Sequence, residues 1–295
     1  MKPNLIYQDT LKVPAATLGE GIHYLPSTQK LYWTDIKTPR LFEYDTIERR
    51  LNVQPFSEPI CWVNHTPPEQ LIVGCASGIY EYNPVTQDKR EIWHNQELAK
   101  NIRLNDAKTD RMGNLYFGTM DDKEQESSGS LFRLLGYGMA GRIDDGYVIS
   151  NGPAFSVSGK TLYSVSSAAK VIYAFDVEPN GQLSNKREFI HFPPQYGTPD
   201  GITVDAEDNI WIACWGGYAV LCYSSKGTLL TAIDIPAPYV TNIIFAGPDL
   251  KDVYITSALH NMTAQALKKY PYAGRVFHFR SEIAGIAETP MAPIK

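Results

Sequence analysis

The 295-residue sequence lacks the motifs of several common enzyme classes. Its six histidines form no HxH or HExxH group, which argues against a zinc protease and against a histidine-rich zinc cage. It has no GxSxG nucleophile elbow and no GxxxxGK[ST] phosphate loop, which argues against an α/β-hydrolase and a P-loop enzyme. The four cysteines form no CxxC pair and lie in or beside apolar segments, which predicts buried free thiols in a reducing compartment.

The sequence is also poor in positive charge and in long apolar runs. A net charge of −5 and a pI of about 5.7 leave no basic stripe for nucleic acid. No run approaches the roughly 18 apolar residues that span a membrane, and the first nine residues contain no apolar signal core. We therefore expect a cytoplasmic protein with neither a nucleic-acid nor a membrane partner. Its oligomeric state stays open.

The abundant residues are those that form strands and turns. Aromatic residues make up 12% of the chain, and there are 22 glycines and 20 prolines. Only short stretches, 95–99 and 262–269, could form a turn or two of helix. The composition therefore predicts an all-β protein.

Apolar, aromatic segments recur along the whole chain. Their spacing of 40 to 48 residues is typical of a β-propeller, and local hairpins are predicted to include 130–133, 171–176 and 219–223. We expect a single domain over residues 1–295, a six-bladed β-propeller. Pairing of residues 5–12 with strands such as 275–280 would close the ring and remove exposed sheet edges. The segment centres are Tyr32, Ile72, Tyr116, Tyr163, Trp211 and Tyr254.

Polar residues precede four of these centres by 11 or 12 residues. Because equivalent residues converge only in a closed ring, we expect them to meet in a central channel. Two carboxylates and two amides offer oxygen ligands that suit a hard divalent cation. The polar positions are Glu20, Asn105, Asn151 and Asp200.

The other two repeats supply the remaining walls of the channel. Counting back 12 residues from the other two segment centres places Ile60 and Asn242 in the channel. Ile60 is apolar and Asn242 is polar. We interpret Asp35, Asp106 and Asp205 as residues that fix the turns at strand ends.

A set of short motifs resembles the gluconolactonase, regucalcin and luciferin-regenerating-enzyme family. The resemblance covers roughly residues 15–280 in the same order. The motifs are Leu18-Gly19-Glu20-Gly21, Arg103-Leu104-Asn105-Asp106, Gly118-Thr119-Met120, Asn151-Gly152, Pro199-Asp200-Gly201 and Tyr254-Ile255-Thr256-Ser257.

The resemblance implies a six-bladed propeller that hydrolyses a sugar-acid lactone to the open aldonate. It implies one divalent metal, with Ca²⁺ or Zn²⁺ favoured and Mn²⁺ or Fe²⁺ as further candidates, ligated by Glu20, Asn151 and Asp200. Arg103 and Asn105 would contact the substrate. We assign Asp200 the second role of general base, because a carboxylate beside a bound water can accept its proton.

Some alternatives remain open. Certain family members carry a substrate-binding glutamate where this chain has Lys123, so contacts from Lys123 and its acidic neighbours are undecided. Arg103 could instead form a structural ion pair with Asp106 or Asp110. The same site could also belong to a non-catalytic calcium-binding propeller or to a phosphotriesterase-type hydrolase.

Overall fold

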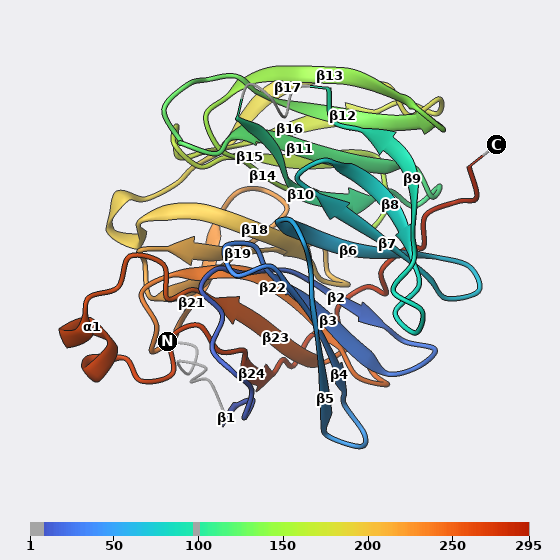
Figure 1. The fold of residues 1–295 in the computed structure, drawn as a ribbon. Coiled ribbons are helices and arrows are strands. Elements are labelled where there is room, and N and C mark those ends of the chain that lie inside the picture. Colours follow the sequence, from blue (N-terminus) through green and yellow to red (C-terminus); the bar gives the residue numbers. More distant parts are fainter. Residues whose placement is uncertain (1–8, 97–100, 295) are drawn as a thin grey trace.

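The computed structural model describes residues 9–96 and 101–294, and its strands form six four-stranded antiparallel sheets arranged as a ring (Figure 1). The all-β class and the six-bladed propeller are therefore confirmed. The first strands of the sheets contact one another around the centre, from β2 to β6, β10, β14, β18, β22 and back to β2. These strands form the channel wall.

Five blades are formed by four consecutive strands each, and the sixth combines three C-terminal strands with one from the N-terminus. The short helices are η2 (Pro194–Tyr196) and α1 (Ala264–Lys269), the latter within the predicted 262–269; part of 95–99 lies outside the described residues. The strands of blades 1 to 3 are β2 (Gly19–Leu25), β3 (Lys30–Asp35), β4 (Arg40–Asp45), β5 (Arg50–Pro55), β6 (Ile60–Thr66), β7 (Gln70–Cys75), β8 (Gly78–Tyr82), β9 (Lys89–His94), β10 (Ile102–Thr109), β11 (Leu115–Asp121), β12 (Gly129–Gly136) and β13 (Met139–Tyr147). Those of blades 4 to 6 are β14 (Ser150–Phe155), β15 (Thr161–Ser166), β16 (Val171–Val177), β17 (Leu183–His191), β18 (Thr198–Val204), β19 (Ile210–Trp215), β20 (Ala219–Tyr223), β21 (Leu229–Asp234), β22 (Val240–Ala246), β23 (Asp252–Ser257), β24 (Phe277–Arg280) and β1 (Asp9–Thr10).

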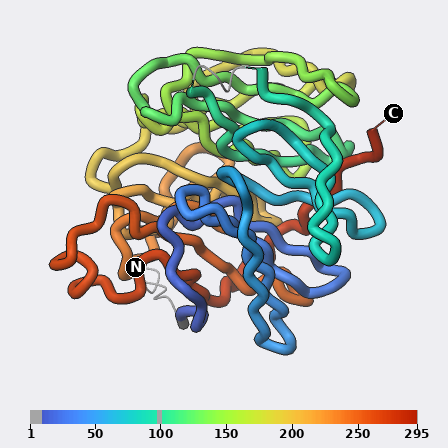
Figure 2. The backbone as a smooth tube through the Cα atoms, viewed as in Figure 1, coloured from blue at the N-terminus to red at the C-terminus, as the bar shows by residue number. Residues whose placement is uncertain are grey.

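The ring closes through pairing of the two ends of the chain, as predicted. Asp9 lies opposite His278 and Thr10 opposite Phe277 in an antiparallel pair of β1 and β24. In Figure 2 the blue start of the described chain lies beside red segments of the sixth blade. Residues 5–8 of the predicted pairing segment lie outside the described residues.

The inner strands of each blade are buried on both faces, and the outermost are largely exposed. In β3, Leu31, Tyr32 and Trp33 are all buried, because each blade packs between two neighbours. In β9, by contrast, only Ile92 is buried. This gradient explains why the second strand of each repeat gives the strongest apolar signal in the sequence.

Every channel-lining strand carries a β-bulge near its start. The pairing register shifts once in each of these strands. A bulge redirects side chains and is common next to functional sites. The shifts fall between Glu20 and His23, Ile60 and Trp62, Leu104 and Ala107, Asn151 and Ala154, Pro199 and Ile202, and Val240 and Ile243.

Gly21, in the first bulge, occupies a site where no side chain fits. Its φ is +56°, and a Cβ would overlap the carbonyl oxygen of Cys61. We expect Gly21→Ala to lower the free energy of unfolding by about 3 kcal/mol, since strain and overpacking add. Gly138 has a φ of +70° with no atom near its Cβ position, so Gly138→Ala should cost only about 1 kcal/mol. Equal losses in denaturant titrations of the two variants would contradict this packing.

The C-terminal segment crosses the propeller on the face where β10 ends. Gly285 pairs with Asp205, Met291 donates its N–H to the carbonyl of His65, and Ala292 donates to Gly113. The segment thus links blades 5, 2 and 3. It lies at one end of the channel and leaves the other end for the polar pocket described below.

Other local predictions can be compared with the structure directly. Asp35 and Asp205 accept backbone N–H groups of adjacent turns, as expected of turn-fixing residues. Cys61, Cys75, Cys214 and Cys222 are buried and form no disulfide, which confirms that part of the prediction. In the described part of the chain, no helix has the length and apolarity to cross a membrane.

Candidate metal and substrate site

A polar pocket opens at the end of the channel where β10 begins. All five predicted site residues line it, and all five are buried. We call it the acidic pocket; its lining comprises Leu18, Glu20, Lys37, Arg103, Asn105, Met120, Glu124, Ile149, Asn151, Ser167, Thr198, Pro199, Asp200, Trp215 and His260. The repeat phase therefore places residues from four blades around one space.

A chain of hydrogen bonds orients the amide side chains of this pocket. Arg103 Nη1 donates to Asn105 Oδ1 at 2.7 Å, and Asn105 Nδ2 donates to Asn151 Oδ1 at 2.6 Å. Asn151 Nδ2 in turn donates to the Ser167 hydroxyl at 2.9 Å. Each amide is thereby fixed with a known oxygen direction. The Asn151 oxygen already accepts one bond and keeps a second lone pair for a ligand.

Three buried carboxylates in the channel have raised pKa values, and burial is the main cause for each. Burial, together with the charge of Asp106, raises the pKa of Glu20 to about 8. Burial also raises the pKa of Asp106 to about 7, although a bond from Gly152 opposes the shift. Asp200 has a pKa well above its usual value because of burial and the charges of Glu20 and Asp106. The channel therefore holds more potential negative charge than its own cations neutralise.

Asp106 corrects one prediction made from the sequence. It does not fix a turn; it lies buried in the channel, where its two oxygens accept bonds from Gly152 N–H and Asn242 Nδ2, both at 3.1 Å. Asn242 Nδ2 also lies 3.3 Å from Glu20 Oε2, so the amide bridges two carboxylates. The predicted channel position of Asn242 is confirmed.

Ile60 was wrongly predicted to line the channel. It is fully buried and packs in the apolar cluster of blades 1 and 2, while Trp62 reaches the channel at the opposite end from the acidic pocket. The bulge in β6 lies at Cys61 and spans two residues instead of the three in the other channel strands, so the repeat spacing does not hold there.

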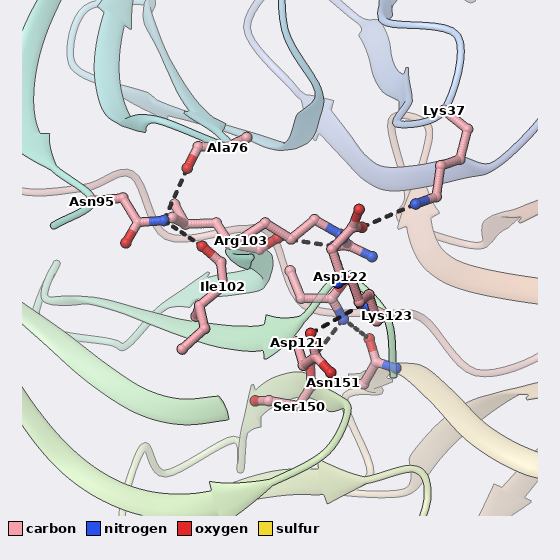
Figure 3. Close-up of polar contacts among 12 residues, drawn as sticks. Lys37, Ala76, Asn95, Ile102, Arg103, Asp121, Asp122, Lys123, Ser150 and Asn151 are labelled. Atoms are coloured by element: carbon pink, nitrogen blue, oxygen red, sulfur yellow. Dashed lines mark hydrogen bonds and ion pairs between the residues drawn. The ribbon is translucent and has the colours of Figure 1, made fainter. Parts of the chain in front are cut away.

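The rim of the acidic pocket contains residues that the repeat phase could not identify. Trp215 lines the pocket and stacks on Tyr239 with ring centroids 4.4 Å apart. Glu124, with a φ of +57°, lines the pocket, whereas Lys123 does not. The ion-pair partner of Arg103 is Asp122, at 2.7 Å, rather than Asp106 or Asp110 (Figure 3).

The donor set of the acidic pocket fits a divalent cation with oxygen ligands. Two buried carboxylates and a pre-oriented amide converge from blades 1, 4 and 5. Within 9–96 and 101–294, no three His, Cys, Asp or Glu side chains form a ready-made cluster, so an amide oxygen must complete the set. Burial raises the carboxylate pKa values because it disfavours the charged forms. A doubly charged ion in the pocket would offset this penalty and favour the ionised carboxylates.

The raised carboxylate pKa values predict how the metal-free protein responds to pH. Glu20 keeps its proton up to about pH 8 in the fold but only to about 4.5 when unfolded. Stability is therefore lost as the pH rises through this interval, by up to about 1.4 kcal/mol per pH unit for each such proton. His23 and His65 have lowered pKa values, mainly through burial, and destabilise the fold only below their unfolded value near 6.5.

The test window is therefore pH 6.5 to 8, above the histidine range and below the raised pKa of Glu20. We expect the thermal midpoint of chelator-treated protein to fall across this window and that of Ca²⁺-saturated protein to change little. Parallel pH profiles for the two forms would contradict the prediction.

The fold and the site define a class of protein: a six-bladed propeller with an acidic pocket at its axis. Comparison with known proteins agrees with this class. The sequence model described as SMP-30/Gluconolactonase/LRE-like region matches residues 18–259. The chain belongs to this family, as its motifs indicate.

Curated relatives include several sugar lactonases. A putative sugar lactone lactonase of Bacillus subtilis is 29% identical over 279 residues, which cover 94% of this chain and 96% of that protein. A pentonolactonase of Haloferax volcanii is 33% identical over 243 residues, covering 82% and 81% of the two chains. A regucalcin of Danio rerio is 36% identical over 181 residues, covering 60% and 61%.

Solved structures support the architecture over nearly the full chain. A calcium-binding protein, regucalcin, from Agrobacterium tumefaciens superposes with a TM-score of 0.93 at 23% identity, covering 97% of this chain and 98% of that one. A luciferin-regenerating enzyme superposes with a TM-score of 0.89 at 26% identity, covering 95% and 97%. These likenesses extend across all six blades.

Proposed function

We propose that this protein is a metal-dependent lactonase that hydrolyses a sugar-acid lactone to the aldonate. The observation that carries the proposal is the convergence of Glu20, Asn151 and Asp200 with Arg103 and Asn105 in one pocket. Relatives named as a pentonolactonase, an L-arabinolactonase and a 6-deoxy-6-sulfogluconolactonase support the substrate class.

Glu20, Asn151 and Asp200 are the residues that would hold the metal. When bound, a divalent ion supplies positive charge for the lactone carbonyl and lowers the pKa of water. With the charge of a bound ion beside it, the buried Asp200 carboxyl would be ionised and would accept the proton of the attacking water; the backbone N–H of Gly201 donates to this side chain. Ca²⁺ and Zn²⁺ are the favoured ions.

Arg103 and Asn105 bind the substrate. Arg103 donates to ring or hydroxyl oxygens, and its guanidinium remains charged at all working pH values. The pocket wall also includes apolar groups, Leu18, Met120 and Trp215. A sugar ring has polar edges and apolar faces, so this mixture suits it.

A pH-indicator assay on a lactone panel tests the proposed activity. The panel contains pentono-, hexono- and uronic-acid lactones, each with metal-stripped and metal-restored protein. We expect at least one sugar lactone to be hydrolysed with metal and the rate to fall to background without it. No turnover on any lactone would favour a second candidate, a non-catalytic calcium-binding propeller, which the regucalcin relatives support.

A phosphotriesterase substrate in the same panel tests the third alternative. An organophosphate pocket would be more apolar than this one, where Lys37, Arg103 and His260 line the wall. We therefore expect organophosphate turnover to be well below lactone turnover. The reverse order would replace the lactonase proposal.

A further inference from the structure

Among the described residues, oxygen atoms accept three hydrogen bonds from two of the nitrogens of Arg103, and the Cys61 thiol also lies against its guanidinium. Nε donates to Asp122 Oδ1 at 2.7 Å, and Nη1 donates to the Leu104 carbonyl at 2.9 Å and to Asn105 Oδ1 at 2.7 Å. None of these bonds uses Nη2. Since the side chain is only 6% exposed and lines the acidic pocket, Nη2 is the donor that can reach a ligand there.

Asp122 is itself held from the far side of the pocket mouth. Lys37, in the turn between β3 and β4 of blade 1, donates to the same Oδ1 at 2.9 Å (Figure 3). Asp122 follows β11 of blade 3, while the corresponding turn of blade 2 contains only Ala76 and Ser77. The Lys37–Asp122 contact thus connects blades 1 and 3 past the short turn of the blade between them.

We propose that Asp122, steadied by Lys37, is a positioning residue that fixes Arg103 with Nη2 directed at the substrate. This inference rests on the proposed lactonase function for its kinetic consequences only; the orientation of Arg103 can be observed without turnover.

The charges around Arg103 explain why a positioning acid is needed. The carboxylate of Glu20, a proposed metal ligand, also attracts the guanidinium. Arg103 has several rotatable bonds, so without Asp122 it can turn toward Glu20 and away from the ligand. Asp122 provides a competing charge-assisted acceptor at Nε, and such bonds are about twice as strong as neutral ones.

The backbone of Arg103 is anchored independently of Asp122. Asn95 Nδ2 donates to the carbonyls of Ala76 and Ile102 at 2.9 and 2.8 Å, which ties the start of β10 to blade 2 (Figure 3). Removing the Asp122 carboxylate therefore frees the Arg103 side chain and leaves the strand in place.

Double-mutant cycles with lactone turnover at saturating metal test the kinetic consequence. We expect Asp122→Ala to raise KM about tenfold with a smaller change in kcat, and Asp122→Glu to restore most of the loss. Lys37→Met should raise KM only about two- to threefold, because its pair is partly exposed. In an Arg103→Ala background, Asp122→Ala should have no further effect.

Glu43→Ala is the matched control for loss of an ion pair. Glu43 pairs with Lys30 at 2.9 Å outside the acidic pocket, so this variant should leave KM unchanged. Equal effects of Asp122→Ala with and without Arg103 would overturn the proposal, since Asp122 would then act by another route.

The ¹⁵Nε–H NMR signal of Arg103, assigned through Arg103→Lys, tests the orientation without any reaction. We expect slow exchange with solvent in the wild type and in Glu43→Ala, and a strongly accelerated exchange or lost signal in Asp122→Ala. An unchanged signal in Asp122→Ala overturns the inference whether or not the protein is a lactonase. Absence of wild-type turnover, by contrast, overturns the proposed function alone.

Discussion

Asp200→Asn, measured at saturating metal, is expected to hydrolyse sugar lactones at least about 100-fold more slowly than the wild type. A positioned general base contributes roughly 10² to 10⁴ to a rate, and asparagine keeps an oxygen at the site while losing the ability to accept a proton. The loss should appear in kcat, because the base acts on the transition state rather than on substrate binding. Steady-state kinetics across metal concentrations provide the measurement.

Metal affinity must be separated from base function in this variant. Asp200→Asn also removes a negative charge, so a raised metal dissociation constant is expected, and occupancy must be verified at each point. Wild-type kcat at full occupancy would show that Asp200 is a ligand only and that the base lies elsewhere.

Glu20→Gln is expected to have opposite effects on the metal-free and metal-loaded forms. Gly21 N–H and Asn242 Nδ2 both donate to Oε2 of Glu20, and a glutamine carbonyl can accept the same two bonds. The substitution therefore removes charge with little change in shape. Metal affinity should fall by more than the roughly 10- to 100-fold typical for loss of an outer-shell partner.

The metal-free Glu20→Gln protein should be more stable than the metal-free wild type near pH 8, because one of the mutually repelling carboxylates is gone. Calorimetric metal titration and thermal unfolding with chelator measure the two effects. Glu43→Gln, a substitution outside the channel, should leave the metal affinity unchanged. Unaltered metal binding by Glu20→Gln would remove Glu20 from the proposed ligand set.

The sequence allowed the ring and the main pocket residues to be predicted because a propeller repeats its own geometry. Equivalent positions in equivalent strands must face the same axis. The phase relative to a central aromatic strand was therefore enough to select Glu20, Asn105, Asn151 and Asp200, which the structure brings to one pocket. Their roles as ligands, base and substrate contacts remain predictions.

The positions that were missed depend on local departures from that repeat. Asp106 follows Asn105 directly, and simple strand alternation cannot turn both side chains inward; the bulge opposite Gly118 does so. Ile60 was misplaced because the repeat is not regular at β6: its register shift spans two residues, from Ile60 to Trp62, whereas the shift in each of the other five channel strands spans three.

Rim contacts depend on loop conformation, which no repeat specifies. The pairing of Arg103 with Asp122 requires the chain to turn sharply after β11. Glu124 adopts a positive φ and reaches the pocket in place of Lys123. The sequence contained one signal for this loop: the cluster of charged residues from Asp121 to Glu124, which indicated that the loop could contact the site.

Metal-dependent lactone hydrolysis at the acidic pocket is tested most directly by titrating stripped protein with Ca²⁺ or Zn²⁺ and recording bound metal and lactone turnover in the same samples. We predict that turnover rises in proportion to bound metal and reaches its plateau at one ion per chain. Asn151→Ala should bind the ion more weakly and require more metal for the same occupancy. Full lactone turnover in protein that retains no bound metal would contradict the account.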